Sequence, residues 1–127
     1  MRTSGFFAIG LLAISAPAFA SPAGVNAQAF YADAEQLMDK GMRAMFDKRT
    51  KPRMAQLRAA AESAKAENDA ATARGKPLYC VSAAQRKKGL GAKKVVTMLG
   101  ALPESDRRKM TLAQAWRAAL IREYPCS

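Results

Sequence analysis

The sequence contains no histidine, and this absence excludes several kinds of active site at once. Histidine is the commonest general base near neutral pH, the proton carrier of Ser-His-Asp and Cys-His groups, and a usual ligand of zinc. Acidic residues are also scarce, and Glu104, Asp106 and Glu123 show no pattern that sets them apart from surface charges. We therefore predict that the protein is not an enzyme, with no catalytic residue, no metal site and no cofactor.

The sequence also lacks an apolar run of the roughly 20 residues that a bilayer-spanning helix needs. Its N-terminal run, Phe6 to Ile14, follows Arg2 and precedes Pro17 and the small-residue segment Ala18-Phe19-Ala20. This order is typical of a cleavable signal peptide. We predict cleavage after residue 20, export to the periplasm, and one domain over residues 21–127 with no transmembrane segment.

Only two cysteines are present, Cys80 and Cys126. They are too far apart in sequence for a C-x-x-C redox motif, which argues against a thiol oxidoreductase. In an oxidising compartment, an isolated cysteine pair in a small domain is most simply a disulfide. We predict a Cys80–Cys126 disulfide bond.

No stretch shows sustained alternation of apolar and polar residues, so we predict an all-α fold, a small four-helix domain closed by the disulfide. The first helix is predicted from an Asn26 cap to about Asp47. Its core face is predicted from the spacing of apolar and small residues, namely Phe30, Leu37, Met38, Gly41, Met45 and Phe46.

The second helix is predicted to begin at Thr50 and to end at Ala73, with Gly75 as a left-handed stop. This helix is rich in alanine and has almost no large apolar residue to bury after Met54 and Leu57. We therefore interpret it as a solvated helix that links two packed parts, and the alternative is a helix docked on a partner.

The third and fourth helices follow a basic segment, 85–91, that we predict to be irregular. The third carries the aliphatic residues before Pro103, and the fourth begins with a capping box formed by Thr111 and Gln114. Trp116, the only tryptophan, lies on the apolar stripe of this last helix and is the predicted anchor of the core.

Positive charge is concentrated in the second half of the chain. Residues 21–69 contain 8 lysines and arginines against 7 acidic residues, whereas residues 70–127 contain 12 against 3. Export argues against nucleic acid as a partner and leaves an acidic secreted protein or an anionic envelope surface. We predict that the basic residues of this half form one partner-binding face, and the alternative is a surface that only keeps the protein in solution. The residues of the predicted face are Arg86, Lys87, Lys88, Lys93, Lys94, Arg107, Arg108 and Lys109.

The segment from Tyr79 to Cys126 combines a Tyr-Cys start, a short loop, an aliphatic helix, Leu102-Pro103, a polar spacer, a capped helix and a closing Tyr124-Pro125-Cys126. This pattern resembles the C-terminal part of the Rap/Tai family, small exported immunity proteins paired with cell-wall amidase toxins of type VI secretion. Residues 26–73 depart from the family, which usually carries another cysteine pair in this half.

The resemblance implies a non-catalytic protein that occludes the catalytic cleft of a secreted amidase. Two other functions stay open from the sequence: a periplasmic chaperone of the acid-stress type, and a basic module that binds the cell envelope. The sequence leaves homodimerisation open as well.

Overall fold

The computed structural model describes residues 21–127, and the predicted signal peptide, residues 1–20, lies outside the described residues. Within 21–127 the chain is helical, and its β-type pairing is limited to one isolated bridge. The all-α class is therefore confirmed, but the expected four helices are six α-helices and two short 3-10 helices. In chain order they are η1 (Pro22–Gly24), α1 (Ala27–Asp39), η2 (Gly41–Phe46), α2 (Thr50–Ala73), α3 (Ala83–Lys88), α4 (Ala92–Gly100), α5 (Glu104–Lys109) and α6 (Leu112–Glu123).

The two additional α-helices, α3 and α5, lie in segments that we predicted to be irregular or a spacer. α3 begins with a capping box in which the Ser82 hydroxyl accepts a hydrogen bond from the Gln85 N–H and the Gln85 side chain accepts one from the Ser82 N–H. α5 begins after Pro103 with Glu104 in its first turn and ends with basic residues, which suits the helix dipole. Each helix has only six residues, too few for an apolar period to be visible in the sequence.

α1 ends earlier than predicted, at Asp39. Gly41 has a φ of +58°, in the left-handed region, so the chain leaves the helix there and turns into η2. As a result Met45 and Phe46 are exposed, whereas Phe30 is buried in the core. The prediction of one continuous core face up to Asp47 is therefore wrong from Met38 onward, since Met38 is exposed as well.

The segment before α1 ties this helix to the start of α6. The Asn26 side chain accepts hydrogen bonds from the backbone N–H groups of Gln28 and Ala29, both at 3.0 Å, which confirms the predicted cap. Next to it, the Leu112 N–H donates to the Val25 carbonyl at 2.7 Å. The N-terminal segment of the described chain is thus hydrogen-bonded to the start of its last helix.

α2 has the predicted bounds and the predicted left-handed Gly75, with a φ of +79°. It is not a solvated linker, however, because it packs along α6. Small side chains allow two helix backbones to approach closely, and alanine therefore serves here for packing as well as for helix propensity. The buried residues of α2 are Ala60, Ala64, Asn68 and Ala71, and α6 contributes Ala115 and Ala119.

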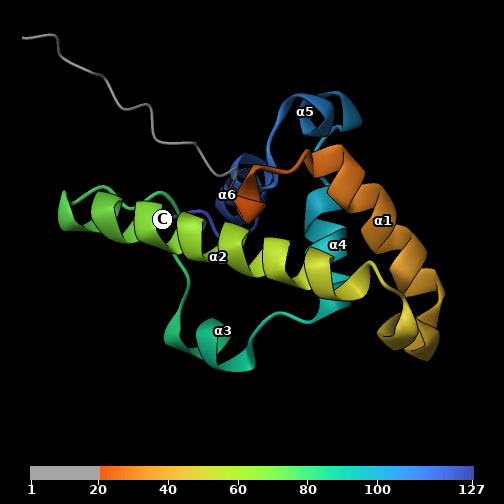
Figure 1. Cartoon of the computed structure of the whole chain (residues 1–127). Coiled ribbons are helices and arrows are strands. Elements are labelled where there is room, and N and C mark those ends of the chain that lie inside the picture. The colour runs from red at the N-terminus through yellow and green to blue at the C-terminus, as the bar shows by residue number, and fades with distance from the viewer. Residues whose placement is uncertain (1–20) are drawn as a thin grey trace, which may run out of the picture.

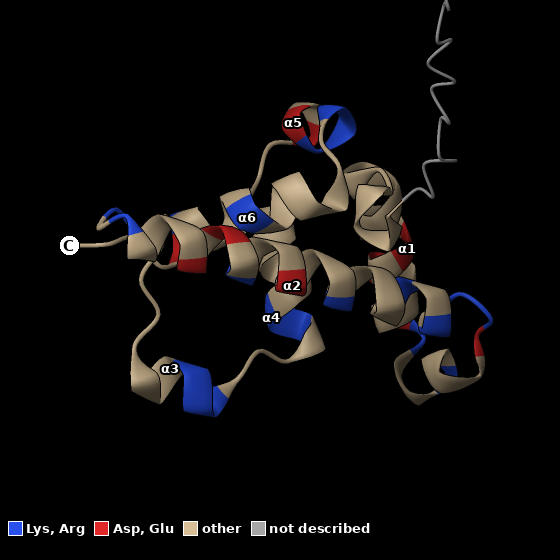
Figure 2. Cartoon of the chain, turned by 60° about the vertical axis from the view of Figure 1, so that its left-hand side comes forward, with Lys and Arg blue, Asp and Glu red and all other residues tan. Residues whose placement is uncertain are grey.

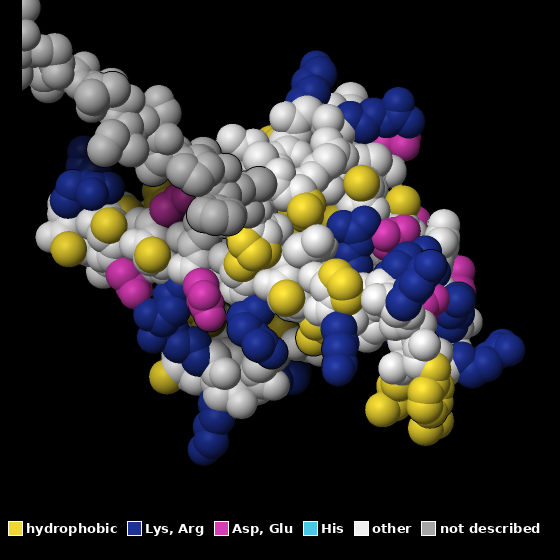
Figure 3. Space-filling view, in the orientation of Figure 1, with side chains coloured by type: hydrophobic (Ala, Val, Ile, Leu, Met, Phe, Trp, Pro, Cys, Tyr) yellow, Lys and Arg dark blue, Asp and Glu magenta, His cyan; other side chains and the backbone are white. Residues whose placement is uncertain are grey.

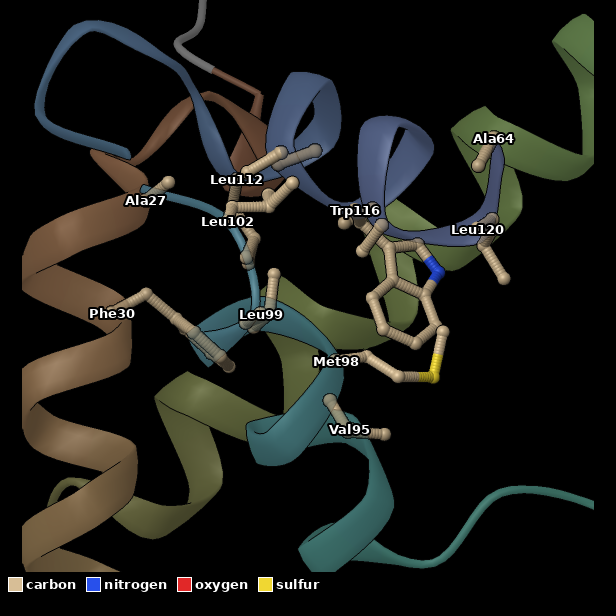
Figure 4. Packing of buried hydrophobic residues seen from close by; sticks show 14 of the residues in the cluster. Ala27, Phe30, Ala64, Val95, Met98, Leu99, Leu102, Leu112, Trp116 and Leu120 are labelled. Atoms are coloured by element: carbon tan, nitrogen blue, oxygen red, sulfur yellow. The ribbon is translucent and has the colours of Figure 1, made fainter. Parts of the chain in front are cut away.

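α6 carries the centre of the core. Its predicted capping box is confirmed, since the Thr111 hydroxyl accepts from the Gln114 N–H at 3.2 Å and the Gln114 side chain accepts from the Thr111 N–H at 3.0 Å. Trp116 is only 4% exposed, as predicted for the core anchor. Figure 4 shows the Met98 side chain of α4 pointing toward the indole, with Val95 beside it.

The predicted disulfide joins Cys80 to Cys126, with their Cα atoms 4.9 Å apart. The Cys80 N–H also donates to the Tyr124 carbonyl at 2.8 Å, so the two chain segments pair next to the sulfur bridge. Buried Asn68 of α2 holds the same segment, because its amide accepts from Leu78 N and Tyr79 N and donates to the Tyr79 carbonyl. The segment that leads into Cys80 is therefore held on α2 by Asn68, and the disulfide connects it to the residues that follow α6.

α2 runs across α4 and α6, with α1 to one side of it (Figure 1). α3 and α5 lie at opposite ends of the molecule in both cartoon views (Figures 1 and 2). Among the helices of residues 21–127, none is both long enough and apolar enough to cross a bilayer.

Candidate partner-binding site

Two adjoining cavities form an apolar groove between α2 and α4. The first, about 350 Å³, is enclosed by α1, η2, the start of α2, and α4. The second, about 250 Å³, lies between α2, the chain just before α4, α4 itself and α6. Met54, Leu57 and Val95 line both cavities, so we treat them as one site, the apolar groove. Its other large apolar lining residues are Phe30, Leu37, Met38, Val96, Leu90 and Trp116.

The groove combines a fixed floor with adaptable edges. Val95 and Trp116 are buried members of the core, so the floor cannot move without disturbing the fold. Met38, Met54 and Leu90 are among the large apolar residues that remain exposed. Methionine is flexible and polarizable, and methionine-rich surfaces suit the binding of apolar partner side chains.

The polar side chains of the first cavity make structural hydrogen bonds. In the first cavity, the Thr50 hydroxyl donates to the Ala44 carbonyl, and the Arg53 guanidinium donates to Asp33 at 2.6 and 2.9 Å. In the second cavity, the polar lining residue is the exposed Arg58. The lining residues bring together no nucleophile and base, and residues 21–127 contain no group of three or more side chains arranged to hold a metal ion. The arrangement suits binding of an apolar surface.

The outer side of η2 forms a second apolar feature, which we call the η2 tip and define by Met42, Met45 and Phe46. These side chains are 84%, 75% and 90% exposed, respectively. They do not line the groove, because Gly41 and Ala44 are the η2 residues on that side. The groove and the η2 tip are therefore separate surfaces on the two sides of one short helix.

A group of ion pairs, the Asp47 network, holds η2 against α1 and α2. The Asp47 carboxylate accepts hydrogen bonds from Lys40 Nζ at 2.7 Å and from the backbone and guanidinium of Arg49 at 2.9 to 3.1 Å. Arg49 also reaches Asp33 at 3.2 Å and Gln36 at 2.7 Å. The network joins the base of the η2 tip to the middle of α1.

These contacts favour the charged forms of their members. The hydrogen bonds from Arg49 and Lys40 hold the pKa of Asp47 well below its usual range. The guanidinium of Arg53 likewise lowers the pKa of Asp33, while the carboxylate of Asp47 raises the pKa of Arg49. Both aspartates are therefore ionised at neutral pH in the folded protein.

We expect the stability of the protein to fall on acidification from about pH 4 downward. Since the folded-state pKa values of Asp33 and Asp47 lie below the unfolded values, the unfolded chain binds more protons in this range. Their contribution is present above the unfolded pKa and is lost as pH falls through the folded pKa. Urea unfolding at several pH values measures the slope.

Asp47→Asn should lower stability at neutral pH and make the acid slope shallower. The matched control is Asp69→Asn, because this carboxylate makes an exposed pair with Lys65 at 2.6 Å on α2. An acid slope that is the same in the Asp47 variant and in the unmodified protein would contradict the role of the network.

The eight basic residues that we predicted to form one face do not share a surface. Arg86, Lys87 and Lys88 are exposed on α3, and Lys93 and Lys94 follow in the first turn of α4. Arg108 and Lys109 are exposed on α5, at the other end of the molecule (Figure 2). Two of these charges are also paired, Lys94 with Glu123 and Arg108 with Glu104. The cluster of α3 and α4 is thus a candidate face without α5.

Arg107, the remaining predicted surface residue, is buried at 6% exposure. Its guanidinium donates to the carbonyls of Leu99 and Leu102, to Gln28 at 2.7 Å, and lies 4.1 Å from the centre of the Tyr31 ring. It therefore satisfies the last carbonyls of α4 and connects α5 to α1. The sequence indicated only the charge, because burial of this arginine depends on Gln28 and Tyr31 of α1, which are distant in sequence.

Arg107→Ala is expected to lower the free energy of unfolding by about 2 to 3 kcal/mol, because hydrogen bonds from a buried charged donor are strong and their acceptors would be left unpaired. Chemical denaturation measures the change. Arg108→Ala is the control: its ion pair with Glu104 is exposed, and we expect a loss under about 0.5 kcal/mol. Equal losses of unfolding free energy in the two variants would argue that the hydrogen bonds of Arg107 do not stabilise the fold.

Sequence reasoning missed the groove and the η2 tip, because it placed Met38, Met45 and Phe46 in a continuous core helix. One signal for the break was available. Gly41 lies inside the apolar pattern, and glycine within a helical pattern marks a candidate helix end. The walls of the groove come from segments far apart in sequence, and no local pattern shows that they meet.

The fold and site define a small, basic, disulfide-closed all-α domain with an apolar groove. Comparison of the chain with protein-family models, with curated proteins and with solved structures gives no match.

Proposed function

We propose that this protein is an exported, non-catalytic binding protein that covers part of an acidic partner protein, as an immunity protein of the Rap/Tai type does. The observation that carries the proposal is the apolar groove. It has the volume to take several side chains, and the polar groups on its first cavity are already used in structural hydrogen bonds. A groove of this kind fits the apolar face of a partner helix or loop.

The charges on the α3 side of the groove favour an acidic partner. Arg58 lines the second cavity. Lys93 lies beside Met38 and Val96 at the edge of the first cavity, where Glu35 and Asp39 share the surface, so the positive rim is confined to the side of Arg58 and α3. The basic helix α3 directly precedes Leu90 of the groove. Figure 3 shows Lys and Arg side chains along the edge of α2 that faces α3, with a few Asp and Glu side chains among them. Such a positive rim would steer an acidic protein toward the groove and raise its association rate.

The resemblance from Tyr79 to Cys126 supports an immunity function. This segment contains the disulfide, α4 with its groove residues, and α6 with the core tryptophan. In this proposal the C-terminal segment supplies the scaffold and one groove wall, while the first half of the chain, which departs from the family, supplies the other wall through α1, η2 and α2. The partner is then a secreted amidase whose cleft is occluded on binding.

The proposal expects a gene for a secreted cell-wall amidase beside the gene of this protein, and the test uses that amidase together with the protein without residues 1–20. We expect direct binding by calorimetry and inhibition of peptidoglycan hydrolysis. Met54→Glu and Leu90→Glu each place a charge in the groove from an exposed position, and each should weaken binding at least about 30-fold. Ile121→Glu is the matched control, since Ile121 is a similarly exposed apolar residue of α6 outside the groove.

A second pair of variants tests the positive rim. Lys87→Glu with Lys88→Glu should slow association at low salt and leave thermal stability nearly unchanged, because α3 contains no buried residue. Absence of any amidase binding by the unmodified protein would overturn the immunity proposal. Binding that survives both groove variants would place the contact surface elsewhere.

A further inference from the structure

The η2 tip is a convex apolar cluster that the groove does not use. Single exposed apolar residues are common on protein surfaces, whereas a contiguous cluster indicates an interaction site. Figure 3 shows the hydrophobic side chains of η2 gathered where this helix projects from the body of the protein. The three side chains are a phenylalanine and two methionines, all at least 75% exposed.

The backbone that carries the tip is well fixed. Asp47 N–H donates to the Ala44 carbonyl and Thr50 N–H donates to the Asp47 carbonyl, both at 3.1 Å, which closes η2 onto the start of α2. The Asp47 network adds the ion pairs to Lys40 and Arg49. Exposure of the tip is therefore a property of the folded structure, since these bonds hold η2 in place while its apolar side chains face solvent.

Positive charge surrounds the tip. From Asp39 to Lys51 the sequence has five lysines and arginines against two aspartates, and one of these, Asp47, is already neutralised in its network. Arg43, Lys48 and Lys51 are exposed and form no ion pair with a carboxylate of residues 21–127. An apolar tip with flanking cations matches the surface of an anionic bilayer, where apolar side chains enter the acyl boundary and cations contact phosphates.

We propose that the η2 tip inserts into the surface of a membrane that contains anionic phospholipid. Met42, Met45 and Phe46 enter the boundary between headgroups and acyl chains, while Arg43, Lys48 and Lys51 contact the lipid phosphates. This places the protein at the membrane surface. The groove uses Gly41 and Ala44 of η2, whereas the tip uses Met42, Met45 and Phe46, so the two proposed contacts involve different residues of this helix.

The shape and the charge of the tip favour a bilayer over a second copy of the chain. A convex tip needs a concave site on a protein partner, whereas a bilayer accepts it without a preformed pocket. Two copies that met through their tips would bring together the same unpaired cations, in a chain with a formal net charge of +11. Like charges held close together oppose this contact.

The experiment measures binding of the protein without residues 1–20 to vesicles of equal amounts of phosphatidylcholine and phosphatidylglycerol, and to vesicles of phosphatidylcholine alone. We expect sedimentation with the anionic vesicles and little with the neutral ones, with binding that weakens as salt is added. Replacing all three tip residues by serine should lower the partition coefficient at least about tenfold. Arg43→Gln, Lys48→Gln and Lys51→Gln should each lower it by roughly fivefold.

A reporter variant separates insertion from adsorption by charge alone. In Phe46→Trp the new indole is exposed while Trp116 stays buried, so insertion should shift its emission to shorter wavelength and allow quenching by brominated lipid. Ile121→Ser is the control for loss of an exposed apolar residue elsewhere, and thermal melts confirm that the tip variants fold. Equal vesicle binding after the triple serine change would overturn the proposal. A dimer in light scattering that the triple change dissociates would overturn it in favour of a second copy.

Discussion

Trp116→Ala is expected to lower the free energy of unfolding by about 3 to 5 kcal/mol, the usual cost of deleting a large aromatic side chain from a core. The indole is 4% exposed and belongs to one cluster with Met98, Leu99 and Leu120. Figure 4 shows these side chains around it, and α2, α4 and α6 all contribute to this region. The cavity left by the substitution would open toward the groove, because Trp116 is also part of its floor. Urea or guanidinium unfolding followed by circular dichroism measures the loss.

Two comparisons make the result specific. Trp116→Phe retains most of the apolar volume and should cost clearly less than the alanine change. Ile121→Ala, on the solvent side of the same helix, should change stability by less than about 1 kcal/mol. A loss under about 1 kcal/mol for Trp116→Ala would show that the tryptophan is not the anchor of the core.

Removing the disulfide is expected to cost up to about 4 kcal/mol, as estimated from the entropy of closing a loop between residues 46 positions apart. The double change Cys80→Ser with Cys126→Ser and reduction of the unmodified protein should give the same loss. The Cys80–Tyr124 backbone bond and the hydrogen bonds of Asn68 hold the same segment, so we expect the reduced protein to stay helical at room temperature.

The control for the disulfide change is the unmodified protein under oxidising conditions, with peptide mapping to verify the bridge. Stability that does not respond to reduction would show that the hydrogen bonds alone fix this chain end. Complete unfolding on reduction would show instead that the remaining core is too small to fold without the bridge, which is common among small domains.

Local features of this protein were predictable because their physical causes are local. The Asn26 cap, the left-handed Gly75 after α2 and the Thr111–Gln114 capping box each depend on neighbouring residues, and each occurs as predicted. The buried Trp116 was predictable because a 3.6-residue period is visible along one helix. The disulfide was predictable because the chain has only two cysteines.

The candidate site was not predictable in the same way. Gly41 is ambiguous in sequence, and only the folded chain shows that α1 ends before it and that Phe46 faces solvent. The basic residues illustrate a similar limit, because charge predicts exposure on average, whereas Arg107 is buried among acceptors from α1 and α4.

By itself, then, the sequence determined the all-α class, the bounds of α2, the starts of α1 and α6, the disulfide and the strong positive charge, since each follows from composition or from interactions between residues near in the chain. Only the tertiary structure decided that the alanine-rich α2 packs on α6, that Arg107 is internal, and that α1, η2, α2 and α4 enclose an apolar groove. The physical reason is that burial and concavity depend on which distant segments meet. A small side chain such as that of Ala64 favours a helix in isolation, but only the facing helix determines whether it is also a packing contact.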